Sequence, residues 1–84
     1  MRSNVDLTLD RRGLAYLKLE QYENAIADYD AALRISPRLP QSLNGRGIAK
    51  YKKGDAVGGD ADIEAAKSIR ADITEEFARY GVKY

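Results

Sequence analysis

The sequence contains no cysteine and no histidine, and these two absences exclude several kinds of site. Without cysteine the chain has no disulfide framework and no thiolate nucleophile, and its redox compartment cannot be inferred. Without histidine it has no imidazole base, and without either residue it has no ordinary zinc site. The sequence therefore predicts no catalytic residues, no metal site and no cofactor.

Long apolar runs are also missing. No run approaches the roughly 20 residues needed to span a bilayer, and residues 1–10 lack the apolar centre of a signal peptide. We therefore expect a soluble, cytoplasmic protein without a membrane partner. A chain of 84 residues forms one small domain, residues 1–84. Such a domain buries only about 60 to 65% of its unfolded surface.

The sequence has no large excess of either charge, because 14 basic and 13 acidic residues leave a net charge of +1. A dedicated nucleic-acid-binding domain would be strongly basic. Nucleic acid is therefore not an expected partner.

Proline occurs at only two positions, Pro37 and Pro40, which mark one break between helices. Pro37 has no backbone N–H with which to continue a helix, whereas Pro40 suits the first turn of a new one. Apolar residues on both sides of this break recur at helical spacing. The pattern predicts five helices and no strand, with helices at about residues 5–19, 21–35, 40–53, 56–70 and 73–80.

Polar residues at the predicted helix starts favour capping. Ser3 or Asn4 can cap the first helix, and Asp55 can cap the fourth. Asp72 and Glu75 have the spacing of a capping box at the start of the fifth helix.

The sequence repeats itself with a period of 34 residues. In this comparison Gly13 aligns with Gly47, and Arg12 aligns with Arg46. Further identities in the same ungapped register are Leu9 with Leu43, Ala15 with Ala49, Lys18 with Lys52, Ala27 with Ala61, Asp28 with Asp62, Ala31 with Ala65, Ala32 with Ala66, and Ile35 with Ile69. The chain therefore contains two copies of one helical hairpin.

These hairpins resemble the tetratricopeptide repeat, whose pattern is W-x2-L-G-x2-Y, then A-x3-F, then P. The first copy has arginine where leucine is usual, and its slots hold Leu9, Arg12, Gly13, Tyr16, Ala25, Tyr29, Ala32 and Pro37. The second copy is degenerate and keeps Leu43, Gly47, Ile63 and Ala66. The first slots of a third copy hold Phe77, Tyr80, Gly81 and Tyr84.

The resemblance implies an all-α fold in which αα-hairpins form a right-handed superhelix of five helices. Repeat one would span about residues 6–39 and repeat two about residues 40–73. The remaining residues, about 73–84, would form a C-terminal capping helix.

The predicted fourth helix is the weakest part of this arrangement. Gly58 and Gly59 each cost about 1 kcal/mol relative to alanine within a helix. Asp60 and Lys67 also stand where the first repeat has apolar residues. Either the fifth helix covers this polar terminal repeat, or the fourth helix opens so that two chains exchange elements.

Two short motifs are only superficially similar to ligand sites. Residues 54–60 are rich in glycine but lack the Gly-Lys-Ser/Thr of a phosphate-binding loop. Asp60, Asp62 and Glu64 alternate as in a calcium loop, yet the glycine and bidentate glutamate that complete such a loop are missing. We interpret these acidic residues as a solvated helix face.

The resemblance also implies a binding surface, because the first helices of such hairpins line a concave groove that receives peptides. Here the first helix of each hairpin is basic and the second is acidic, so the candidate groove would be positive. Its candidate peptide-binding residues are Arg11, Leu14, Lys18, Gln41, Asn44, Ile48, Tyr51 and Lys52. A simpler alternative is that Arg46, Lys50, Lys52 and Lys53 pair with acidic neighbours and have no ligand.

Two functions therefore remain open. The first is a non-catalytic protein–protein interaction module whose groove binds a peptide segment with acidic residues. The alternative is a structural, self-associating fragment of a longer repeat array, either dimeric or helix-swapped. Its exposed end, at residues 80–84, would stack on the next repeat or on another copy.

Overall fold

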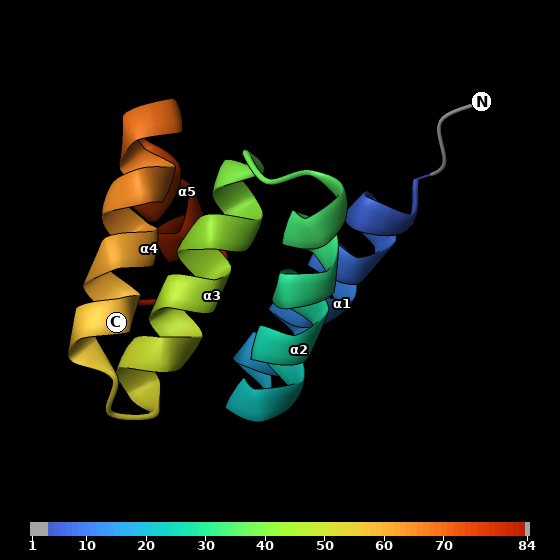
Figure 1. The fold of residues 1–84 in the computed structure, drawn as a ribbon. Helices are drawn as coiled ribbons and strands as arrows, with labels where there is room; N and C mark the ends of the chain where they lie inside the picture. The colour runs from blue at the N-terminus through green and yellow to red at the C-terminus, as the bar shows by residue number, and fades with distance from the viewer. Residues whose placement is uncertain (1–3, 84) are drawn as a thin grey trace.

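A computed structural model describes residues 4–83 and contains, over that range, five α-helices and no strand. The helices are α1 (Val5–Lys18), α2 (Tyr22–Ile35), α3 (Pro40–Lys52), α4 (Ala56–Ile69) and α5 (Ile73–Arg79). α1 with α2, and α3 with α4, form two antiparallel hairpins that lie side by side (Figure 1). The predicted number and order of helices are confirmed.

The first helix of each hairpin ends on a residue in the left-handed conformation. This residue is Glu20 after α1, with a φ of 61°, and Gly54 after α3, with a φ of 99°. α5 ends in the same way at Gly81, with a φ of 84°. The residue that follows donates its N–H to a carbonyl five positions back, from Gln21 to Tyr16 (2.9 Å), Asp55 to Lys50 (2.9 Å) and Val82 to Phe77 (3.0 Å). α5 therefore ends as the first helix of a third hairpin would.

The predicted caps are only partly correct. The Asp55 carboxylate accepts the N–H of Gly58 at 2.8 Å, which confirms the cap of α4. Asn4 makes no side-chain cap at α1, and Ser3 lies outside the described residues. The capping box at α5 is wrong, because Asp72 makes no cap and its carboxylate lies instead 3.5 Å from Nε of Arg70.

The first hairpin packs around the ring of Tyr29, which is fully buried. A Cβ atom added to Gly13 of α1 would lie 3.0 Å from Cε1 of this ring. A Cβ atom added to Gly45 of α3 would overlap the Cζ and Oη atoms of the same ring. The ring therefore lies between two glycines of different helices, and it joins α2 to both α1 and α3.

The second hairpin packs backbone against backbone. A Cβ atom on Gly47 of α3 would lie 2.8 Å from the carbonyl oxygen of Gly59, and one on Gly59 of α4 would lie 2.7 Å from the carbonyl oxygen of Gly47. No side chain fits between the helices at this crossing. Gly59 thus has a packing role that offsets its low helix propensity. The buried apolar residues of α4 are Ile63 and Ala66.

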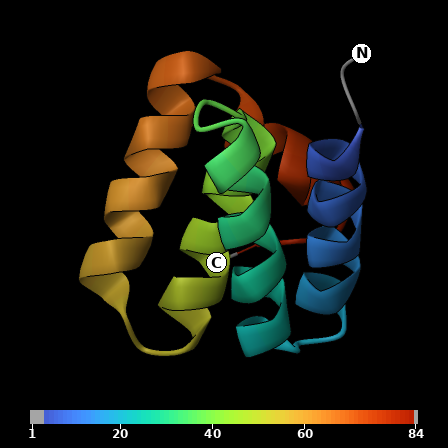
Figure 2. The same cartoon turned by 45° about the vertical axis from the view of Figure 1, so that its right-hand side comes forward.

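α5 lies on the same side of the two hairpins as α1 and α3 (Figures 1 and 2). Its residues Ile73 and Phe77 are 0% and 2% exposed, and α5 contacts both α3 and α4. Both residues belong to the core cluster that also contains Ile48 of α3 and Ile63 of α4. α5 thus covers part of the second hairpin from the side on which the candidate groove lies.

Candidate peptide-binding groove

The candidate groove runs along α1 and α3, and the chain covers part of it with residues 77–83, which we call the C-terminal segment. Figure 2 shows α5 between α1 and α3. Beyond α5, Val82 joins the core cluster that contains Leu17 of α1 and Ile48 of α3. The C-terminal segment leaves two small pockets along the groove.

The first pocket lies between α1 and α5 and has a volume of about 190 Å³. Three of the predicted groove residues line it, namely Arg11, Leu14 and Gln41. Its carboxylates already have partners, because Asp10 accepts the Ser42 hydroxyl at 2.8 Å and Glu76 lies 2.8 Å from Nη2 of Arg70. Burial raises the pKa of Asp10 above its ordinary value, although the hydrogen bond from Ser42 opposes this. The first pocket is therefore close to neutral.

The second pocket, of about 140 Å³, lies at the C-terminal ends of α1 and α3. It brings together three more of the predicted groove residues, Lys18, Ile48 and Lys52. Its apolar floor includes Leu17 and Ile48, which are 4% and 1% exposed, and Val82 of the C-terminal segment lies in the same pocket. Around this floor stand Lys18, Glu20, Lys52 and Lys83, so lysines outnumber the single acidic residue.

The lysines of the second pocket have no carboxylate partners within residues 4–83. No ion pair there includes Lys18, Lys52 or Lys83. The Nζ atom of Lys18 lies 5.7 Å from the centre of the Tyr80 ring, a cation–π contact that joins α1 to the C-terminal segment. An anionic group that enters this pocket would therefore meet ammonium groups free to pair with it.

The last two predicted groove residues, Asn44 and Tyr51, differ in position. Asn44 is fully buried, and among the described residues neither polar atom of its side chain has a hydrogen-bond partner. It lies on the same face of α3 as Gln41 of the first pocket and Ile48 of the second. Tyr51 lies toward α4 instead, with its Cβ atom 3.1 Å from the position of a Cβ atom on Gly59.

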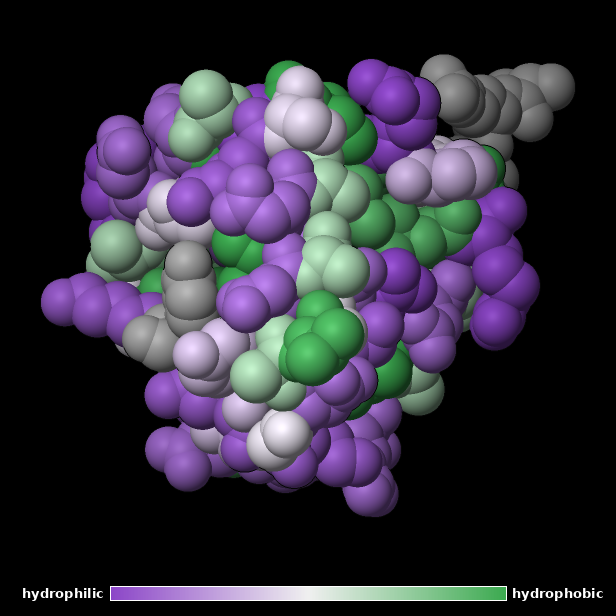
Figure 3. Space-filling view, turned by 60° about the vertical axis from the view of Figure 1, so that its left-hand side comes forward, coloured by the Kyte–Doolittle hydropathy of each residue, from purple (hydrophilic) through white to green (hydrophobic). Residues whose placement is uncertain are grey.

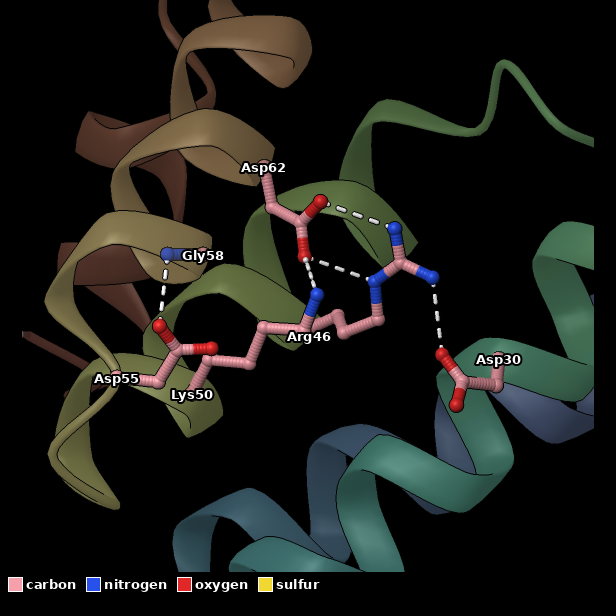
Figure 4. A network of polar contacts seen from close by, with 6 residues as sticks. All are labelled: Asp30, Arg46, Lys50, Asp55, Gly58 and Asp62. Carbon is pink, nitrogen blue, oxygen red and sulfur yellow. Dashed lines mark hydrogen bonds and ion pairs between the residues drawn. The ribbon is translucent and has the colours of Figure 1, made fainter.

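Another basic residue of α3 connects the two hairpins. Nε and Nη2 of Arg46 donate to the two carboxylate oxygens of Asp62 on α4, at 2.8 and 2.9 Å (Figure 4). Nη1 of Arg46 donates to Asp30 on α2 at 2.9 Å, and Lys50 lies 3.1 Å from Asp62. Burial alone would raise the pKa of Asp62, but the hydrogen bonds from Arg46 and Lys50 outweigh it and lower this pKa.

These ion pairs test the simpler alternative, in which the basic residues of α3 and its end pair with acidic neighbours and have no ligand. Lys53 pairs with Glu23 at 2.9 Å, so pairing with acidic neighbours is confirmed for Arg46, Lys50 and Lys53. It is wrong for Lys52, for which no ion pair exists among the described residues. Lys52 therefore remains available to a ligand.

The first hairpin contains an equivalent pair that was not predicted from the sequence. Nε and Nη2 of Arg12 donate to both carboxylate oxygens of Asp28, at 2.7 and 2.8 Å. The position of Arg12 is the one where the family pattern usually has leucine. The missed signal was that both members of this pair recur 34 positions later, as Arg46 and Asp62.

A further open surface lies at the N-terminal edge, which we define by the residues that line a pocket of about 670 Å³: Asn4, Asp6, Leu7, Ile35, Ser36, Pro37, Arg38 and Leu39. Leu7 is 40% exposed and Ile35 is 53% exposed. The side of the molecule that carries α4 is mainly hydrophilic, with apolar atoms in separate patches (Figure 3).

The end predicted to be exposed and to stack on another copy is exposed at Tyr80, whose exposed fraction is 42%, and only partly folded back, so its stacking stays a prediction. The Tyr80 hydroxyl donates to Glu76 at 2.9 Å, and Val82 is buried. Tyr84 lies outside the described residues.

Comparison with protein families agrees with this geometry. A family model described as TPR repeat matches residues 13–54, half of the chain. Comparisons with curated proteins and with solved structures give no match. Among the described residues, no helix has the length and apolar character required to cross a membrane. The chain therefore belongs to the tetratricopeptide repeat family, whose members serve as protein-interaction modules.

Proposed function

We propose that this domain binds a peptide segment with acidic residues in the groove along α1 and α3. The observation that carries the proposal is the second pocket, where unpaired Lys18 and Lys52 stand beside the apolar floor of Leu17 and Ile48. An apolar side chain of the peptide would contact this floor. A neighbouring carboxylate would accept hydrogen bonds from the two ammonium groups.

The apolar floor and the lysines would contribute differently to binding. An exposed ion pair contributes at most about 1 kcal/mol. Burial of a leucine or phenylalanine side chain contributes about 1.5 to 3 kcal/mol. We therefore expect the floor to supply most of the affinity, and the lysines to supply preference for acidic peptides and sensitivity to salt.

Fluorescence anisotropy with a labelled peptide in which glutamates flank leucine or aromatic residues tests this proposal. Lys52→Glu should weaken binding about tenfold at low salt, because it replaces an attractive charge with a repulsive one. Lys67→Glu is the matched control, since Lys67 lies on α4 and lines neither groove pocket. An affinity that neither salt nor Lys52→Glu alters would contradict the acidic preference, and failure of all such peptides to bind would contradict peptide binding.

Self-association is a second candidate function, favoured by the apolar side chains at the N-terminal edge. Leu7 and Ile35 are 40% and 53% exposed there. Exposed apolar patches of this kind occur where another repeat or another chain packs. Sedimentation at increasing concentration separates the two candidates, because a mass that stays monomeric up to high concentration contradicts self-association.

A further inference from the structure

We infer that the peptide recognised by the groove has the pattern of the chain's own C-terminal segment, followed by an acidic residue. In that pattern a large apolar residue precedes an aromatic residue by three positions, and an aliphatic residue follows two positions later. Phe77, Tyr80 and Val82 hold these places in the intact chain, and a partner peptide would displace them. The inference rests on the proposed function, because it specifies the peptide that the groove accepts.

Each of these three side chains occupies a distinct place along the groove. Phe77 is 2% exposed and lines the first pocket together with Leu14 of α1. The Tyr80 ring meets the ammonium group of Lys18. Val82 is 8% exposed and lies in the second pocket with Leu17. The groove therefore holds one helical turn, followed by one residue that comes after the chain has reversed its direction.

The reversal depends on Gly81. Its φ of 84° directs the chain back after α5, and Val82 donates its N–H to the carbonyl of Phe77 at 3.0 Å. Few residues other than glycine adopt this conformation at low cost. A partner with glycine or asparagine at this position would present its aliphatic residue in the same way.

The charge of the C-terminal segment does not match its site. Lys83 follows Val82 and adds a third lysine to a pocket that already contains Lys18 and Lys52. Like charges around one pocket repel, whereas a glutamate in the place of Lys83 would be attracted to both lysines of the groove. The groove therefore favours an acidic residue at the position where its own occupant has Lys83.

Asn44, on the groove face of α3, has two polar atoms that are buried and unpaired among the described residues. A buried polar group without a hydrogen bond destabilises the state in which it occurs. The repulsion at Lys83 weakens the closed arrangement, which makes the C-terminal segment a displaceable occupant.

Isothermal titration with two peptides tests this inference. One has the sequence of residues 73–83 with glutamate in the place of Lys83, and the other retains the lysine. The chain variant Val82→Asn should bind the glutamate peptide at least tenfold more tightly than the unchanged chain, because asparagine cannot occupy the apolar floor. The lysine peptide should bind more weakly than the glutamate peptide to both chains.

Val57→Asn is the matched control, since Val57 is 84% exposed on α4. This substitution makes the same change in side chain at a solvent-exposed position outside the groove. The variant should bind both peptides with the affinity of the unchanged chain. Equal affinity of the unchanged chain and Val82→Asn for the glutamate peptide would overturn the inference. Circular dichroism checks that both variants keep their helices.

A second experiment uses a disulfide to hold the C-terminal segment in the groove. The chain has no cysteine, so Leu17→Cys combined with Val82→Cys introduces a single pair of thiols at two positions that line one pocket, and mass spectrometry reports whether they form a disulfide on oxidation. The oxidised chain should lose peptide binding at least tenfold, and reduction should restore it. Equal binding by the oxidised and reduced chains would overturn displacement of the C-terminal segment.

These outcomes separate the inference from the proposed function. If an acidic peptide without the aromatic and aliphatic pattern binds through Lys52 and Val82→Asn has no effect, the proposed function stands and the inference fails. If the glutamate peptide binds Val82→Asn but Lys52→Glu has no effect, the pattern stands and the acidic preference fails.

Discussion

The two hairpins share one register of 34 residues but fill their interiors in different ways. In the first hairpin the ring of Tyr29 lies between Gly13 and Gly45. The equivalent position of the second hairpin holds Ile63, and there Gly47 and Gly59 bring the helix backbones together.

Other features are the same in both hairpins, namely the arginine–aspartate pair and the left-handed residue between the helices. The comparison teaches that the repeat keeps the left-handed turn and the arginine–aspartate pair of each hairpin. The space between its helices, in contrast, can be filled by an aromatic ring or closed by direct approach of the backbones.

The largest expected effect is the loss of the ring. Tyr29→Ala should destabilise the chain by about 3 to 5 kcal/mol, because it leaves a cavity between three helices. Ile63→Ala at the equivalent position removes fewer atoms and should cost about 2 to 4 kcal/mol. Urea unfolding followed by circular dichroism measures both, and a smaller loss for Tyr29→Ala than for Ile63→Ala would contradict the central role of the ring.

A smaller effect distinguishes the two adjacent glycines of α4. Gly59→Ala should cost about 2 to 3 kcal/mol, because the new methyl group meets the backbone of α3, which cannot move aside. Gly58→Ala should change stability by less than about 0.5 kcal/mol, since the gain in helix propensity offsets displacement of the flexible Asp55 cap. Thermal unfolding of both variants gives the ranking, and equal losses would show that helix propensity alone decides at these positions.

A third effect, no larger than that at Gly59, compares the arginine–aspartate pairs. Asp62→Asn should cost about 2 to 3 kcal/mol, because it weakens hydrogen bonds between charged groups and leaves a half-buried Arg46. Asp28→Asn should cost less, since the side chain of its partner Arg12 is 60% exposed. Denaturant unfolding of the two variants checks this order. A larger loss of unfolding free energy for Asp28→Asn would mean that the more exposed pair stabilises the fold more.

The Arg46–Asp62 pair predicts that the free energy of unfolding depends on pH. The pKa of Asp62 in the folded chain lies below its ordinary value of 3.8, so its ionised form stabilises the fold above that pH. This contribution is lost as the pH falls below 3.8 toward the pKa of the folded chain. The difference in unfolding free energy between the unchanged chain and Asp62→Asn should therefore be constant from about pH 5 to 7 and shrink below pH 3.8.

Helix positions followed from the sequence because the apolar spacing, the two prolines and the 34-residue period all indicate the same boundaries. The packing of Gly13 against a neighbouring element also followed, since a glycine at a helix face permits close approach. The capping box at Asp72 failed for a physical reason. Arg70, two positions earlier, competes for the carboxylate that the cap would have used.

The site was less predictable than the fold. Spacing along α1 and α3 placed Lys18, Ile48 and Lys52 on one side, and the structure brings them to one pocket. No pattern in the sequence indicated that Val82 would share a pocket with Ile48, because these distant positions come together only after the left-handed turn at Gly81. Which lysines would be left without partners likewise depends on tertiary distances.

The connection between α4 and α5 has a consequence for the concentration at which a partner can act. Only residues 70–72 separate the two helices, and Arg70 holds the joint through contacts to Asp72 and Glu76. So short a tether keeps the C-terminal segment at an effective concentration of about 1 mM or more beside its groove. A free peptide at a lower concentration therefore competes only to the extent that it binds the empty groove more tightly than the C-terminal segment does. The length of this joint sets an affinity threshold that excludes weak ligands.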